Sequence, residues 1–186
     1  MPLRHVAERN NGTSRAAYRD NGFGPDFKVA MPSNLATYVH DHLAGAQFAI
    51  ELLQDLSEKA SDPRVTALAA ALLPEIESDR SVLQRFAEAL GEEPSGAKES
   101  AAWITQKLSR VKLAAADDLG AFEAIETLSL GILGKLALWN SLKVLKACDA
   151  VKVLRLPDLM TAAEQQHARV EQLRHELAPN VLTMQR

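Results

Sequence analysis

The chain has 186 residues, of which 47% are hydrophobic and 24% charged, and its formal net charge is −3. This length suits one well-buried domain, and the near-neutral charge gives no reason to expect nucleic-acid binding, which normally needs a basic patch. The single cysteine, Cys148, excludes an internal disulfide and a multi-cysteine zinc site.

Residues 1–32 show no sustained hydrophobic period and are interrupted by Asn-Gly, Gly-Pro and Met-Pro steps. This pattern is typical of a flexible or loosely docked N-terminal arm. No apolar segment follows Met1, so no secretory signal is expected, and a cytoplasmic protein is the default.

Two amphipathic helices are predicted over 33–59 and 63–90. Ser33 and Asp62 are favourable N-caps, and Gly91 is a favourable C-cap. The turn between the helices is short, so they should be antiparallel neighbours.

The two helices have apolar stripes that predict their buried faces. The stripes are Leu35, Tyr38, His42, Ala46, Ala49, Leu53 and Leu56 in the first, and Val65, Leu68, Leu72, Ile76, Leu83, Phe86 and Leu90 in the second. His42 and Asp79 lie near the centres of these faces. Because the two helices fold back on each other at this turn, the numbers of two facing residues sum to about 121. Leu56 and Val65 are one such pair, and His42 and Asp79 are another. The pattern therefore predicts that His42 contacts Asp79, either as a structural pair or as part of a metal or proton-handling site.

A long connection over 91–116 follows the second helix and contains an amphipathic piece over 97–113. One long connection between two short ones is typical of a ferritin-like four-helix bundle whose crossover carries a short extra helix. A five-helix bundle with 97–113 as a full member is the alternative.

The third helix, predicted over 117–146, is apolar on nearly all sides from Leu128 to Leu142. It falls short of the roughly 20 residues that span a bilayer, so no membrane segment is expected. Such a helix should be buried all round, covered by 97–113 or, as we favour, by a second copy of the chain in a homodimer. Gly131 and Gly134 would allow another backbone to approach closely.

Lys135 interrupts this apolar helix and needs a partner if it is buried. Glu126 and Asp79 are candidate acids that the sequence does not rank. Snorkelling of the ammonium group toward water is the other solution.

The last helix is predicted over 157–178, between Pro157 and Pro179, with residues 179–186 as a tail. Its apolar stripe includes Gln166, while Glu164 should lie on the outer face. The helical domain is thus expected to cover 33–178.

Three segments of the chain resemble sequences of uncharacterised bacterial members of the ferritin-like superfamily. They are His-Asp-His-Leu-Ala-Gly (40–45), Glu-Ile-Glu-Ser-Asp-Arg (75–80) and Glu-Gln-Gln-His (164–167). The resemblance implies one Glu from each of the first and third helices and Glu-x-x-His from the second and fourth. The matching positions in helix order are His42 or Asp41, Glu75, Glu123 or Glu126, and Glu164 with His167. Ser78 stands where the second helix would carry its His.

Three hypotheses for function follow, and the sequence leaves open whether the protein is an enzyme. The first is a non-catalytic bundle that acts through association or as a stress-related scaffold, with no cofactor. The second is a di-metal oxidoreductase or metal-handling protein with iron or manganese held by some of His42, Glu75, Asp79, Glu126 and His167. The third is a bundle that binds an apolar ligand between the first and third helices, where small residues leave room: Gly45, Ala46, Ala49, Gly131 and Gly134.

Overall fold

The computed structural model describes residues 34–91, 117–145, 151–152 and 154–183, and every structural statement below refers to these. They form four helices and no strand: α1 (Asn34–Lys59), α2 (Pro63–Leu90), α4 (Asp118–Lys143) and α5 (Leu156–Thr183). The all-helical prediction is confirmed for this part of the chain. The predicted arm over 1–32 and the predicted extra helix over 97–113 lie outside the described residues.

Side-chain caps define the starts of α2 and α4, and the cap at Asp62 is as predicted. The Asp62 carboxylate accepts a hydrogen bond from the backbone N–H of Arg64 at 2.8 Å. The Asp117 carboxylate accepts one from the backbone N–H of Gly120 at 2.7 Å. Gly91 ends α2 with a φ of 67°, a left-handed conformation that glycine adopts without strain.

The predicted end of the last helix is wrong, because α5 continues through Pro179 to Thr183. A proline near a helix end removes one backbone hydrogen bond but does not have to stop the helix. The hydroxyl of Thr183 donates to the carbonyl oxygen of Pro179 and completes the last turn. α4 ends at Lys143, slightly before the predicted residue 146.

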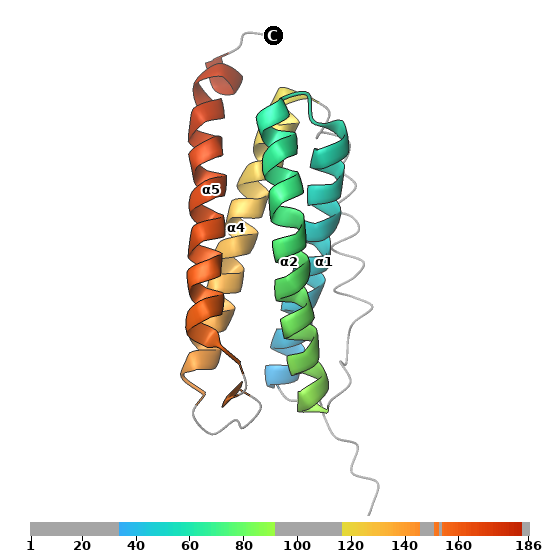
Figure 1. Cartoon of the computed structure of the whole chain (residues 1–186), viewed down its shortest axis with the longest axis vertical. Helices are drawn as coiled ribbons and strands as arrows, with labels where there is room; N and C mark the ends of the chain where they lie inside the picture. The colour runs from blue at the N-terminus through green and yellow to red at the C-terminus, as the bar shows by residue number, and fades with distance from the viewer. Residues whose placement is uncertain (1–33, 92–116, 146–150, 153, 184–186) are drawn as a thin grey trace, which may run out of the picture. The chain divides into compact units, whose positions relative to one another are not determined.

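The helices form two antiparallel pairs, α1 with α2 and α4 with α5, as Figure 1 shows. The pairs meet where α1 packs on α4 and α2 packs on α5. α2 and α4 therefore face each other across the diagonal of the bundle.

α2 and α4 run in the same direction. The Ser61 hydroxyl, in the turn between α1 and α2, donates to Asp118 Oδ1 at 2.8 Å, so α4 begins at the end of the bundle where α2 begins. α2 ends at the opposite end of the bundle (Figure 1).

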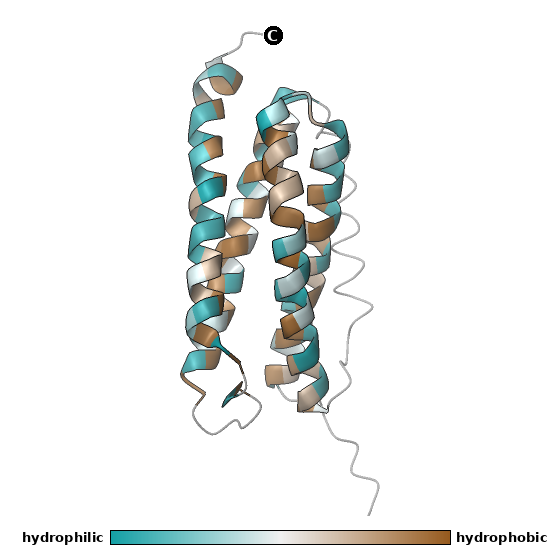
Figure 2. Ribbon diagram, in the orientation of Figure 1, coloured by the Kyte–Doolittle hydropathy of each residue, from teal (hydrophilic) through white to brown (hydrophobic). Residues whose placement is uncertain are grey.

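The buried faces of α2 and α5 agree with their predicted stripes. In Figure 2, hydrophobic residues recur along α5 among hydrophilic ones, as expected for a helix with one buried face. Gln166 is 2% exposed and lies within that face. Glu164 is exposed, as predicted.

The predicted stripe of the first helix is confirmed at Leu53 and Leu56, which are buried, and is wrong in the N-terminal part of the helix, which is rotated. Val39, Leu43 and Ile50 are buried, whereas Tyr38 is 36% exposed and His42 is half-buried. Two apolar stripes lie side by side on α1, and the stripe with the larger aliphatic side chains is the one that enters the core. The adjacent stripe with smaller side chains therefore takes a half-buried position.

The predicted cover of the third helix, 97–113 or a second copy of the chain, lies outside the described residues, so its burial on all sides stays a prediction. Leu130 and Leu133 of α4 are 64% and 43% exposed. α1 and α5 pack on α4. Among the described residues, nothing covers the apolar face of the helix that carries Leu130 and Leu133.

Candidate functional site

A buried polar cluster joins α2, α4 and α5. The Lys135 ammonium donates to Asp79 Oδ2 at 2.5 Å and also to Gln166 Oε1. The Gln166 amide donates to the same Asp79 oxygen at 3.2 Å. Because burial of a polar group without a partner is costly, this mutual satisfaction is what permits three polar residues inside the bundle.

The cluster corrects the predicted pair of His42 with Asp79. Within the described residues, Asp79 bonds to Lys135 and Gln166, and no hydrogen bond joins it to His42. The rotation of α1 moves His42 to the side, where its ring packs edge-on against Tyr38, with centroids 4.7 Å apart. Of the two acids predicted for Lys135, Asp79 is the partner.

Burial is the largest influence on the pKa of two groups on this side of the bundle, Lys135 and His42. It lowers the pKa of Lys135 below its ordinary value, and the attraction of Asp79 opposes that effect. Burial likewise lowers the pKa of His42, opposed by the charge of Asp41. His42 is therefore neutral at pH 7.

A cavity of about 390 Å³ lies beside this cluster, between α1, α2 and α4. Its walls are mainly apolar, and the wall residues include Leu53, Leu72, Ile76, Leu83, Leu128 and Leu138. Asp79 and Lys135 also line it, which places the ion pair at the cavity wall. Asp41, His42 and Arg80 add polar groups.

Small residues on two facing helices keep this space open. α1 contributes Gly45, Ala46 and Ala49, and α4 contributes Gly131 and Gly134. A Cβ atom placed on any of these three glycines would meet nothing within 4 Å. Nothing in the described structure approaches Gly131 or Gly134 closely, so the missing side chains leave room, and close approach of a second copy stays a prediction.

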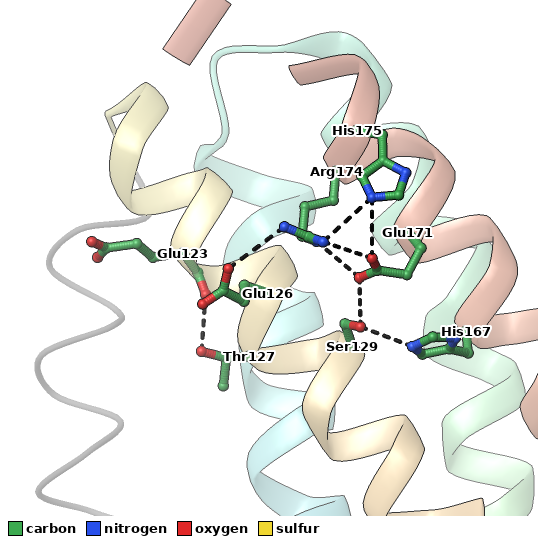
Figure 3. A network of polar contacts seen from close by, with 8 residues as sticks. All are labelled: Glu123, Glu126, Thr127, Ser129, His167, Glu171, Arg174 and His175. Carbon is green, nitrogen blue, oxygen red and sulfur yellow. Dashed lines mark hydrogen bonds and ion pairs between the residues drawn. The ribbon is translucent and has the colours of Figure 1, made fainter. Parts of the chain in front are cut away.

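A second polar network links α4 to α5 nearer the end where α4 begins (Figure 3). The Ser129 hydroxyl donates to Glu171 Oε1 at 2.7 Å and lies 3.1 Å from His167 Nε2. Arg174 holds Glu171 with two hydrogen bonds of 2.9 and 2.7 Å. These donors, Arg174 first and then Ser129, lower the pKa of Glu171 to about 2.

This network brings a serine beside a histidine, which the sequence did not reveal because the two residues are 38 positions apart. The arrangement differs from a hydrolytic triad, in which the imidazole accepts the serine proton and the carboxylate orients the imidazole. Here the Ser129 hydroxyl donates its hydrogen bond to Glu171 and not to the imidazole, and the serine is only 5% exposed. The network therefore connects two helices and does not present a nucleophile.

The predicted metal ligands are distributed among different partners. Glu75 accepts a hydrogen bond from Arg169 at 2.5 Å, and the same contact lowers the pKa of Glu75. Oε2 of Glu126 lies 3.7 Å from Nη1 of Arg174. In the described ranges, no three His, Cys, Asp or Glu residues come together in a way that could hold a metal ion. Binding of iron or manganese stays a prediction.

No helix among the described residues is both long and apolar enough to cross a membrane. Comparisons with protein families, with curated proteins and with solved structures found no match for the chain.

Proposed function

We propose that this chain is a non-catalytic, ferritin-like helical bundle that acts by binding a small apolar molecule in the cavity between α1, α2 and α4. The cavity of about 390 Å³ carries this proposal, because ligand sites typically measure about 300–1,000 Å³. If each heavy atom of a ligand takes about 30 Å³, the volume of one water molecule in the liquid, the cavity has room for roughly a dozen ligand heavy atoms.

The glycines of the cavity wall support a binding role. Gly45, Gly131 and Gly134 lie inside helices, where glycine costs about 0.5–1 kcal/mol relative to alanine. A Cβ atom would fit at each of them. A ligand that fills the same space accounts for glycine at positions where packing alone would favour a larger side chain.

The ferritin-like assignment is supported by the direction of the helices. α2 and α4 are parallel, and the connection between them, 91–116, is long, while shorter connections join the other pairs. One long crossover is the connection that distinguishes ferritin-like bundles from simple up-and-down bundles.

Calorimetric titration with 1-decanol, a neutral apolar probe of suitable size, tests the binding proposal. We expect saturable binding and a rise in melting temperature, because a ligand that binds only the folded state stabilises it. Gly134→Leu should fill the cavity and abolish binding. Ala137→Leu is the matched control, because Ala137 is exposed on α4 and does not line the cavity. Failure of 1-decanol to bind the natural chain would contradict the proposal.

Association through α4 is the second candidate, because Leu130 and Leu133 expose apolar surface on that helix. A homodimer formed there should dissociate in Leu133→Glu, as measured by light scattering. Leu182→Glu is the control, because Leu182 is 60% exposed on α5. A natural chain that is monomeric at all concentrations would contradict association.

A further inference from the structure

Lys135 is a lysine at the wall of the cavity between α1, α2 and α4. It lies one helical turn after Gly131 and one turn before Leu138, and both of these residues also line the cavity. Its side chain is 15% exposed, so it is largely buried without being fully sealed. The other lysines in the described ranges are exposed and do not line the cavity: Lys59, Lys143 and Lys152.

The contacts of Lys135 place its nitrogen at the cavity wall. Nζ donates to Asp79 Oδ2 at 2.5 Å and to Gln166 Oε1. Asp79 lies on the cavity-lining face of α2, one turn after Ile76 and one turn before Leu83. The contact between Nζ and Oδ2 therefore joins two residues that both line the cavity. An ammonium group has three N–H donors, and the described residues accept two of them, which leaves one position on Nζ for a further bond.

Lys135 has a larger fraction of free amine than an exposed lysine. Burial lowers its pKa below the ordinary value, opposed by the attraction of Asp79. The free amine is the form of lysine that attacks carbonyl groups. A lysine that is removed from water in an apolar pocket is one of the settings in which proteins form imines with carbonyl compounds.

From this placement we infer that the ligand is an aliphatic aldehyde, which condenses with Nζ of Lys135 while its hydrocarbon chain occupies the apolar part of the cavity. The inference rests on the proposed binding function and adds the chemical class of the ligand. It also gives the buried ion pair a role in ligand capture as well as in stability.

The condensation is reversible and needs no oxidant or reductant. The carboxylate of Asp79 first accepts one proton from the ammonium group of Lys135. The amine then attacks the carbonyl carbon, a C–N bond forms, and a proton passes from the nitrogen to the carbonyl oxygen. Asp79 returns its proton to the resulting hydroxyl, which leaves as water while the C=N bond forms. The protonated imine keeps one positive charge and one N–H, so its pairing with Asp79 is preserved.

Reductive trapping with decanal and sodium cyanoborohydride tests the inference, because cyanoborohydride converts an imine into a stable secondary amine. Decanal has the same chain length as 1-decanol. Intact-mass analysis and peptide mapping of the natural chain should find one decyl group on Lys135. Labelling there should be at least about tenfold faster than at exposed Lys143, because binding in the cavity raises the effective concentration of the aldehyde. 1-Decanol should suppress the labelling of Lys135 and leave that of Lys143 unchanged.

Lys135→Arg keeps a cation for Asp79 and removes the amine, so it should abolish the fast labelling. Lys143→Arg is the matched control, because Lys143 is exposed on α4 and does not line the cavity. It should leave the labelling of Lys135 unchanged. Thermal melts establish whether each variant is folded. Peptide mapping of the natural chain identifies the modified residue even if Lys135→Arg does not fold.

The outcomes separate the two proposals. Decanal adducts at exposed lysines only, in a chain that binds 1-decanol, would overturn the aldehyde inference and leave apolar binding intact. Labelling of Lys135 that 1-decanol does not suppress would place the reaction outside the cavity and also overturn the inference. A chain that neither binds 1-decanol nor becomes labelled at Lys135 would overturn both proposals.

Discussion

Lys135 of α4 and Asp79 of α2 form an ion pair across the diagonal of the bundle, with Nζ and Oδ2 2.5 Å apart. Their side chains are only 15% and 12% exposed. The pair connects the two helical hairpins at one height, and Gln166 completes it from the remaining neighbour, α5. It also forms part of the wall of the adjacent cavity.

We expect Asp79→Ala to lower the free energy of unfolding by about 3 kcal/mol, because it leaves the Lys135 ammonium buried without its counter-ion. Lys135→Met should have a similar effect through the stranded carboxylate. The double variant Asp79→Leu/Lys135→Met should recover much of the loss, since it leaves no unpaired charge. Urea denaturation of all three measures this coupling. Additive losses in the double variant would mean that the pair acts as two independent groups.

Gly131→Ala and Gly134→Ala should each raise the free energy of unfolding by about 0.5–1 kcal/mol. Alanine favours a helix by that amount, and the added Cβ atom meets nothing within 4 Å. Gly91→Ala is the control with the opposite expected sign, because Gly91 has a φ of 67°. Thermal melts check these signs. A loss of stability at both cavity glycines would indicate that the space is occupied or required.

Glu171 should contribute to acid unfolding. Its pKa in the folded chain is about 2, below its ordinary value of 4.5, so its contacts stabilise the fold above pH 4.5 and lose that effect as the pH falls toward 2. Glu171→Gln should therefore cost about 1 kcal/mol at pH 7 and progressively less at lower pH. Glu164→Gln, an exposed position on the same helix, is the control. A cost of Glu171→Gln that does not change with pH would contradict this assignment.

Elemental analysis of protein purified without chelator should find less than one equivalent of iron, manganese or zinc. The predicted ligands Glu75 and Asp79 would have to leave Arg169 and Lys135 to bind a cation, which would strand two charges. Stoichiometric metal that is lost in both His42→Ala and Glu75→Gln would contradict this prediction and favour the oxidoreductase hypothesis.

Local signals in the sequence were sufficient for most of the secondary structure. Asp62 as a cap and Gly91 as a terminator act within a few residues of chain and could therefore be identified from sequence. The buried faces of α2 and α5 follow from one dominant stripe on each helix. α1 and α4 lack a single dominant stripe, and the predicted face of α1 was wrong in its N-terminal part.

The sequence by itself determined that this chain is helical, where most of its helices start, and that a few small residues could leave room between the first and third predicted helices. Only the tertiary structure decided which acid holds Lys135, that Ser129 meets His167, and that the small residues of α1 and α4 line one cavity. The physical reason is that helix periodicity and capping depend on neighbouring residues, whereas the rotation of a helix and its contacts across the bundle depend on the packing of all the helices together.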